Sequence, residues 1–478
     1  MGGIFSSLSS SLDALRTLQN ALEVSQNNVS NSSTPGYARQ VATFEAQPFN
    51  PAGGLAGGVE AGPTQSTQNE YANQAVRTEY SAQGYYSAQS SALSSIQSLF
   101  DVSGQTGVLG ALNNLFQSFS AWSATPDSTA AQQSVIANAQ ALAQSFQSTS
   151  ASLAQTTSSL NQQISSTVQQ VNTLASAIQQ DNVQIQKSGG TPDAGVSANL
   201  EASLESLSQL VDTTVTFAPD GTATVLLGQG QSPLVIGTQQ YSLSASFTGT
   251  TPGGNANAVP DAQILDSNGD DVTSQFSQGS LGGLLNVRNT VLPSLQGDAS
   301  QQGELNQLAQ QVADSVNQVL TSSTTLSGQT GGPLLDYSSS SPVEAAQTLT
   351  VDPNITPGTL APTDPGPPPV QNGAALTLSN LGNSTDPADQ IDGQTILQFL
   401  NGIATQVGQQ ASDAQTGQTL HSTLLTQAQA VQTQISGVSL DAEAVQVLQL
   451  QQGYSAVGKM VSVVDSLAGT LISMVGTG

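Results

Sequence analysis

The stretch on which the fold depends is LDAEAVQVLQLQQGYSAVGKMVSVVDSLAGTLISMV, from Leu440 to Val475. Apolar residues recur in it at alternating steps of three and four, which is the spacing of a heptad seam along one face of a long helix. The members of this seam are Val447, Leu450, Tyr454, Val457, Val461, Val464, Ala468, Leu471 and Val475. A helix cannot bury such a one-sided seam by itself. We therefore expect it to pack against a helix of this chain or of a neighbouring copy.

A second seam lies at the opposite end of the chain, with sevenfold spacing. Its members are Leu8, Leu15, Leu22 and Val29. Two amphipathic helices of an ordinary bundle would give the same two patterns. However, the positions that flank the C-terminal seam are polar and mostly uncharged, so the charge pairs that usually select a coiled-coil partner are missing. Gly453 and Gly458 each cost about 1 kcal/mol relative to alanine in a helix, a cost that is tolerable where backbones approach closely, as in a tightly packed tube.

The composition limits the classes of partner and chemistry. The 478 residues suffice for two to four domains. Only 8% of them are charged, and the net charge is -26. Just six residues are basic, so we expect neither nucleic acid nor anionic membranes as partners. The chain has no cysteine and one histidine, His421, which we expect to be a lone exposed residue in a polar helical stretch. These residues provide no thiolate metal site, zinc protease motif or Cys-His pair. We predict no enzyme activity, no cofactor and no metal.

We expect none of the usual targeting segments. Met1 to Ser11 contains neither the basic region nor the apolar core of a secretory signal peptide. No run of eighteen apolar residues occurs, so we expect no insertion into a membrane. If the protein leaves the cell, we expect a route without a cleaved signal.

A motif follows the first predicted helix, NNVSNSSTPGYARQ at residues 27–40. Physically it is a helix end rich in asparagine and serine, followed by a Pro-Gly turn in which Gly36 supplies a positive φ. The string closely resembles the N-terminal signature of the axial proteins of the bacterial flagellum, the rod, hook and hook-associated families. A matching C-terminal signature is present in SGVSLDAE at 436–443 and LQQGYSA at 450–456, where Gly453 departs from the family's usual helix former. The matching N-terminal positions are Asn27, Asn28, Asn31, Thr34, Pro35, Gly36, Tyr37, Arg39 and Gln40.

The middle of the chain alternates helical and extended patterns. Helical patterns cover about 67–100, 107–124, 196–212 and 396–435, and a helix of about 55 residues begins with Thr125 as its N-cap. Alternating residues and an Asp-Gly turn at 220–221 predict a β-rich insert. We expect short strands in the Pro-rich excursion, such as Ala346 to Val351. The predicted domains are 1–40 with 436–478 for axial assembly, 41–212 with 279–435 for a long-helix bundle that includes the excursion 330–372, and 213–278 for the insert.

The segment at 279–289, GSLGGLLNVRN, and the layout of the long helix resemble the hook-associated protein 1 family in particular. Two departures are a charge-poor segment at 199–206 and the absence of a histidine after Asn317. The resemblance implies a mainly α fold with inserted β, in which both chain ends form a long antiparallel helical bundle and a small β-rich domain faces outward. It also implies a structural subunit that joins hook to filament, assembles through its terminal helices and is exported unprocessed by the flagellar type III apparatus to the extracellular flagellum.

The implied partners are other copies of the chain, hook protein, hook-associated protein 3, an export chaperone for the C-terminal region and, transiently, the filament cap protein. One alternative is a hook or distal-rod subunit, because those families share the end motifs. Another is an extracellular binding module or adhesin that uses the β insert and the excursion. The acidic stretch from Asp266 to Asp271 has a misplaced glycine for a calcium loop, and we expect a turn there.

Overall fold

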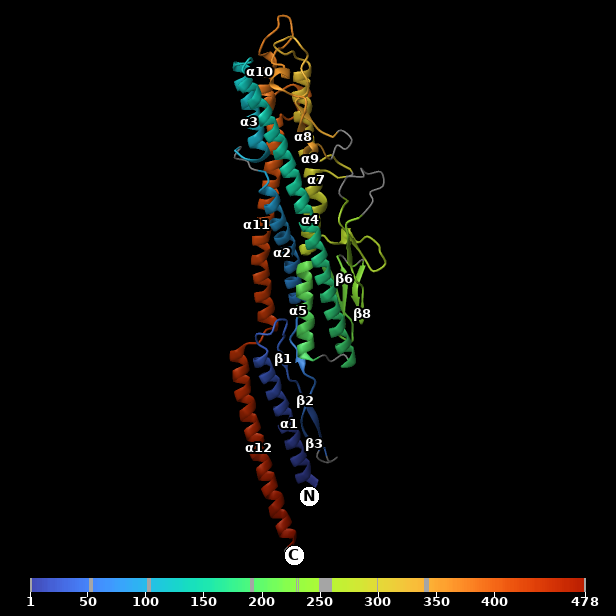
Figure 1. Ribbon diagram of the computed structural model, residues 1–478. Coiled ribbons are helices and arrows are strands. Elements are labelled where there is room, and N and C mark those ends of the chain that lie inside the picture. The colour runs from blue at the N-terminus through green and yellow to red at the C-terminus, as the bar shows by residue number, and fades with distance from the viewer. Residues whose placement is uncertain are drawn as a thin grey trace.

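The protein is an elongated, mainly helical molecule in which both chain termini lie at one end (Figure 1). The computed structural model describes residues 2–50, 55–100, 105–189, 193–228, 230, 232–248, 260–298, 300–338 and 344–476. At the end with the termini, α1 (Gly2–Ser30) and α12 (Leu440–Gly476) pack against each other, with the hairpin of β2 (Phe44–Asn50) and β3 (Leu55–Ala61) beside α1. We call these elements the terminal unit and residues 70–436 the body. The predicted fold class is confirmed.

The body is built around long helices that run along its axis. The pair α2 (Glu70–Gln97) and α11 (Ile396–Ser436) is antiparallel, and α4 (Thr129–Lys187) lies beside it (Figure 1). The other helices are α3 (Gly107–Ala124), α5 (Ala194–Leu210), α6 (Gly279–Asn286), a π-helical turn (Val287–Val291), α7 (Leu292–Gln296), α8 (Glu304–Thr321), α9 (Ala345–Thr348) and α10 (Gly373–Asn380). Short 3₁₀ turns occupy Thr273–Gln275, Pro357–Thr359, Leu381–Asn383 and Pro387–Asp389.

The start of the long helix α4 differs from the expectation. Its N-cap is Ser128, whose side chain accepts a hydrogen bond from the Ala131 backbone N–H, and the helix extends over 59 residues. Thr125 instead ends α3, as the C-cap. Both residues have the chemistry of a cap, and the turn between the two helices decides which one is used.

The β structure is small and antiparallel. The strands β5 (Thr213–Phe217), β6 (Ala223–Leu227), β7 (Ser232–Ile236) and β8 (Gln239–Gln240) form one sheet in that order. Asn182 of α4 holds the sheet, because its Nδ2 donates to the carbonyls of Ala223 and Gly237 at 2.7 Å each. The other pairs are β1 (Gln40–Val41) with β4 (Gln65–Ser66), β9 (Ser244–Ser246) with β10 (Gln263–Leu265), and β11 (Leu335–Asp336) with β12 (Thr350–Val351).

Two sequence expectations concern loops of the body. The predicted strand from Ala346 to Val351 is wrong in its first half, because Ala345–Thr348 is a turn of helix and only Thr350–Val351 is a strand. The acidic stretch after β10 is a turn, in which Asp266 Oδ1 accepts hydrogen bonds from the backbone N–H groups of Asn268 and Asp270. In the part of the chain that the structure describes, no three acidic, histidine or cysteine side chains group into a potential metal site.

Among the side chains that the structure describes, the hydrophobic core lies within the body. Its buried members extend along the chain from Ala92 to Ala414 and include Phe119, Trp122 and Phe146, and no described side chain of α1 or α12 belongs to it. Of the described apolar side chains in the terminal unit, Ala21 and Leu450 are buried. Within the described residues, no helix is long and apolar enough to cross a membrane.

Candidate functional site

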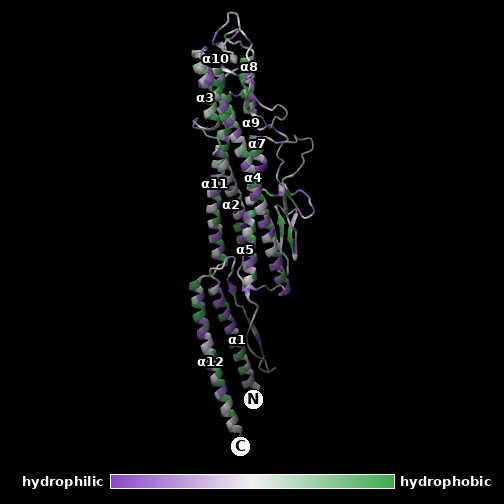
Figure 2. Ribbon diagram, in the orientation of Figure 1, coloured by the Kyte–Doolittle hydropathy of each residue, from purple (hydrophilic) through white to green (hydrophobic). Residues whose placement is uncertain are grey.

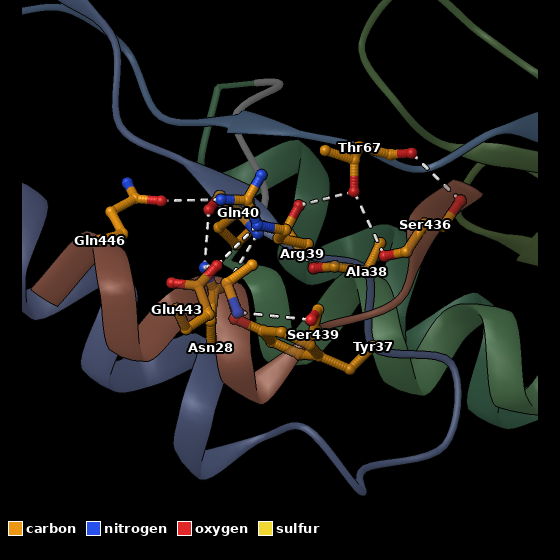
Figure 3. Close-up of polar contacts among 11 residues, drawn as sticks. Asn28, Tyr37, Ala38, Arg39, Gln40, Thr67, Ser436, Ser439, Glu443 and Gln446 are labelled. Atoms are coloured by element: carbon orange, nitrogen blue, oxygen red, sulfur yellow. Dashed lines mark hydrogen bonds and ion pairs between the residues drawn. The ribbon is translucent and has the colours of Figure 1, made fainter. Parts of the chain in front are cut away.

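The two end motifs meet in space at the junction of the terminal unit and the body (Figure 3). Arg39 Nε donates to Glu443 Oε1 at 2.6 Å, and Arg39 Nη2 donates to Gln446 Oε1 at 2.8 Å. The Glu443 side chain is 0% exposed and the Arg39 side chain is 27% exposed. An ion pair therefore closes the contact between residues that are 404 positions apart in the chain.

Asn28, near the end of α1, completes this contact and uses all of its hydrogen-bonding capacity. Its Nδ2 donates to the Gln40 carbonyl at 2.8 Å and to Glu443 Oε1 at 3.3 Å. Its Oδ1 accepts the Gln40 backbone N–H at 2.8 Å and lies 3.0 Å from the Tyr37 hydroxyl. A buried amide that makes every one of its bonds holds a single geometry. Burial, followed by the charges of Glu443 and Asp193, raises the pKa of Tyr37, which keeps this hydroxyl protonated.

The remaining motif residues form a turn that docks on the body. Asn31 Nδ2 donates to Asn27 Oδ1 at 2.9 Å, and Thr34 Oγ1 donates to Asn31 Oδ1 at 3.2 Å. After the exposed Pro35, Gly36 has a φ of +73°, and a Cβ there would lie 2.3 Å from the Ala198 carbonyl of α5. Glycine is required at this position because of the positive φ and because a side chain would clash with α5.

Backbone hydrogen bonds join the three segments that pass between the terminal unit and the body. The Arg39 N–H donates to the Ser436 carbonyl at 2.8 Å, and the Thr67 N–H donates to the Arg39 carbonyl at 2.9 Å. Ser436 Oγ donates in turn to the Thr67 carbonyl at 3.1 Å. We call Asn28, Arg39, Thr67, Ser436 and Glu443 the joint. Its contacts constrain how the terminal unit is oriented on the body.

The N-terminal seam lies off the centre of the buried face of α1. Leu8, Leu15 and Leu22 are half-buried, and Val29 is 41% exposed. The most deeply buried residues of α1 are small or polar, namely Thr17, Ala21, Ser25 and Asn28. α1 packs on two neighbours, α12 and β3, and the seam leucines lie toward the edge of that double contact.

The C-terminal seam faces α1. Leu450 is buried, Val447, Val457, Val461 and Val464 are half-buried, and Tyr454 and Leu471 are 41% and 42% exposed. At Gly453 an added Cβ would lie 3.6 Å from Leu18 of α1. Val475 belongs to α12, but its side chain is outside the described residues.

The expectation that α12 is apolar on one side only is wrong. A second set of apolar residues lies outside the seam that faces α1, and each large member is exposed by more than half. Figure 2 shows apolar positions recurring along the length of α12. Counting along a single heptad seam misses this face, which repeats at steps of three and four from residue 456 to residue 467 and is interrupted by the polar Gln452. We call these residues the outer stripe: Val445, Leu448, Ala456, Met460, Val463 and Leu467.

A second ion pair, missed in the sequence, lies on the body side of the joint. Arg77 of α2 donates through Nη1 to Glu201 Oε1 of α5 at 2.7 Å and also pairs with Glu70. Gln68 Nε2 donates to the other Glu201 oxygen at 3.3 Å. Burial raises the pKa of Glu201 to about 7, since the loss of solvation outweighs the opposing charge of Arg77. Glu201 lies within the charge-poor segment 199–206, where the pattern alone pointed to no role.

His421 also differs from the expectation, because it is neither isolated nor freely exposed. Its Nδ1 lies 2.8 Å from Glu79 Oε2, and its ring stacks on Tyr86 with 5.3 Å between the ring centres. These contacts tie α11 to α2. Sequence spacing could not reveal them, because the partners are more than 300 positions away.

Comparison with known proteins agrees with the architecture. Residues 93–335, about half of the chain, match the family described as the flagellar hook-associated protein FlgK helical domain. Residues 429–474 match the C-terminal region of the flagellar basal body rod FlgEFG proteins. The flagellar hook-associated protein 1 of Bacillus subtilis (strain 168) is 25% identical over 529 residues, which cover 100% of both chains. The solved structure of the flagellar hook junction protein FlgK from Burkholderia pseudomallei has a TM-score of 0.61 at 16% identity, and the similarity covers 76% of this chain and 100% of that one.

The helical fold, the paired chain ends and these matches define a structural protein of the bacterial flagellum. The chain belongs to the FlgK family of flagellar hook-associated proteins.

Proposed function

We propose that this protein joins the hook to the filament of the bacterial flagellum and assembles with further copies of itself through the terminal unit. The observation that carries the proposal is the outer stripe of α12, where large apolar side chains are exposed on a helix whose other face already packs on α1. Burying a leucine, valine or methionine side chain is worth about 1.5–3 kcal/mol. A continuous row of such residues on a surface is typical of an interaction site.

The charge distribution supports self-association through this unit. Residues 1–61 and 440–478, which contain the terminal unit, carry three basic and seven acidic residues, a net charge of -4. Residues 62–439 carry three basic and 25 acidic residues, a net charge of -22. Copies that approach through the terminal unit therefore bring together much less like charge than copies that approach through the body.

The relatives support the place of assembly. One is named a hook-associated protein, and the solved structure is that of a hook junction protein. By this likeness, the proposed partners are other copies of the chain, hook protein below, hook-associated protein 3 toward the filament, a chaperone that holds the C-terminal region before export, and transiently the filament cap. The proposed location is the extracellular flagellum, reached through flagellar type III export.

We propose a structural role without catalysis. In the joint, Arg39 donates hydrogen bonds to the Glu443 carboxylate and to the Gln446 side chain. Such groups bind chain ends together and are not poised to transfer protons to a substrate.

A hook or distal-rod subunit is the second candidate, because the match at 429–474 is to the C-terminal region of rod-type proteins. The match of the helical domain at 93–335 favours the hook-associated family over that candidate. An independent adhesin function of the β insert has no comparable support.

Electron microscopy of cells that lack this chain, with flagellin measured in the medium, tests the proposal. We expect intact hooks without filaments and flagellin lost to the medium. Absent hooks would instead indicate a rod or hook subunit, and normal filaments would contradict any role in assembly. Re-expression of the wild-type chain is the control.

A further inference from the structure

Three carboxylates surround one buried arginine close to the joint. Arg77 of α2 donates to Glu201 of α5 and pairs with Glu70, and Glu205 follows Glu201 on α5 by four residues. The side chains of Arg77 and Glu201 are 6% and 2% exposed. We call Glu70, Arg77, Glu201 and Glu205 the charged cluster. With every carboxylate ionised, three negative charges would share one positive charge.

This arrangement favours one bound proton, and Glu201 is the group that holds it. Burial raises the pKa of Glu201 to about 7, because the charge of Arg77 opposes the loss of solvation only in part and the charges of Glu205 and Glu70 add to it. Glu201 and Glu205 also lie four residues apart on one helix, where like charges repel. The neighbouring segments supply uncharged amides, since Gln68 donates to Glu201 and Gln432 donates to Glu205.

Those two amides lead directly to the joint. Gln68 follows Thr67, whose backbone N–H donates to the Arg39 carbonyl at 2.9 Å (Figure 3). Gln432 lies on α11, one helical turn before Ser436. The hydrogen-bond partners of both α5 carboxylates are therefore within a few residues of the joint.

The helix α5 also carries the surface on which the motif turn docks. A Cβ added at Gly36 would lie 2.3 Å from the Ala198 carbonyl and 3.0 Å from the Ala202 backbone nitrogen. Ala202 is the residue next to Glu201. A movement of α5 away from α2 would thus withdraw the support of the turn at the same time as it strains Gln68.

We propose that protonation of Glu201 holds the joint closed, and that loss of this proton lets the joint open more often by making the three carboxylates of the charged cluster repel one another. A buried group that prefers its neutral form stabilises the closed state at low pH, and this contribution is lost as the pH rises to about 7. The joint is therefore tight in a mildly acidic medium and looser in a mildly alkaline one. The inference concerns the single chain and does not depend on the proposed place in the flagellum.

Hydrogen exchange of the isolated full-length chain at pH 5.5 and pH 8.5 tests this. Peptides that contain Arg39 or Thr67 would be followed by mass spectrometry, and the rates would be expressed as protection factors, so that the pH dependence of the chemical exchange step cancels. We expect protection in the joint to fall by up to about thirtyfold from the lower to the higher pH, the limit reached if opening restores an ordinary pKa to Glu201.

Two variants identify the responsible group. Glu201→Gln cannot ionise, so its joint should keep nearly the same protection at both pH values. Asp181→Asn is the matched control, because Asp181 of α4 is also buried and burial raises its pKa to about 6, but it lies outside the charged cluster. Its joint should keep the pH dependence of the wild type. Protection of α4 at both pH values checks that each variant is folded.

Three outcomes would overturn the inference. The first is a wild-type joint with equal protection at both pH values. The second is a pH dependence that survives in Glu201→Gln or disappears in Asp181→Asn. The third is equal protection of the joint and of α4, which would mean that the joint opens only when the whole body unfolds. None of these results bears on whether the protein joins hook to filament, which the deletion experiment decides.

Discussion

The body and the terminal unit differ in how completely they bury their apolar side chains. The body encloses a continuous core from Ala92 to Ala414, in which residues such as Leu153 and Phe146 are 0% exposed. Among its described residues, the terminal unit buries few apolar side chains and leaves the outer stripe open. The body is thus complete within one chain, whereas the terminal unit presents surfaces that a second copy can cover. The joint lies between these two regions.

The largest expected effect follows from breaking the joint. Arg39→Ala leaves the Glu443 carboxylate buried without its cation, and removing one partner of a buried ion pair costs about 3–5 kcal/mol. We expect α12 to lose its amide protection in hydrogen exchange while the core of the body keeps its own. Adding Glu443→Gln to this variant should restore part of the protection, because the buried charge is then gone.

Arg16→Ala is the matched control for the joint. Arg16 pairs with Asp13 at 3.5 Å, but its side chain is 81% exposed, and exposed pairs contribute little. Equal losses of protection in Arg39→Ala and Arg16→Ala would contradict the role given to the joint.

Replacing one leucine by alanine in each region tests how much each leucine contributes to the stability of the single chain. Leu153→Ala in the core should lower the free energy of unfolding by about 2–5 kcal/mol, because it leaves a cavity. Leu448→Ala on the outer stripe should change it by less than about 0.5 kcal/mol, since Leu448 is exposed in the single chain. Urea unfolding measures both. If both variants fold, Leu448→Ala should be incorporated into flagella less well than Leu153→Ala. Normal incorporation of Leu448→Ala would count against a contact between copies at the outer stripe.

The stability of the body should depend on pH through Glu201. Burial raises the pKa of this carboxyl in the folded state to about 7, above its ordinary value of 4.5, so ionisation is disfavoured by folding. The free energy of unfolding should therefore fall as the pH rises from about 4.5 to about 7, by at most roughly 3.5 kcal/mol. Glu201→Gln removes this contribution, and urea midpoints across that range should fall less steeply than for the wild type. Parallel profiles would show that Glu201 titrates normally.

The smallest expected effect concerns a glycine in α12. No heavy atom lies within 4 Å of a Cβ added at Gly458, so Gly458→Ala should stabilise the helix by about 1 kcal/mol. Hydrogen exchange of the isolated chain would detect the gain. If the same variant also assembles poorly, then a neighbouring copy approaches the helix backbone at Gly458. Unchanged assembly would mean that no such close approach exists there.

Much of the local structure could be predicted, because helices follow apolar spacing. The predicted range 107–124 coincides with α3, and α11 and α12 begin where their patterns begin. The start of α4 was misplaced because Thr125 and Ser128 are equally good caps, and the turn that chooses between them is tertiary.

The joint was predictable only in its parts. The two end motifs were recognisable as strings, but spacing along the chain contains no sign that Arg39 would meet Glu443 or that Asn28 would bond to both segments. The pairs of His421 with Glu79 and of Arg77 with Glu201 were missed for the same reason. The outer stripe is different, because its apolar residues can be read from the sequence, beside those of the more regular seam.

The most direct test of the contrast between the two regions is hydrogen exchange of the isolated full-length chain compared with the assembled one. We predict that amides at residues 1–35 and 440–476 are only partly protected in the isolated chain, far less than those of α4, and become fully protected on assembly, because their missing apolar contacts are intermolecular. Amides of α4 should be protected in both states. Full protection of residues 1–35 in the isolated chain would contradict the account, since the terminal unit would then be as complete as the body.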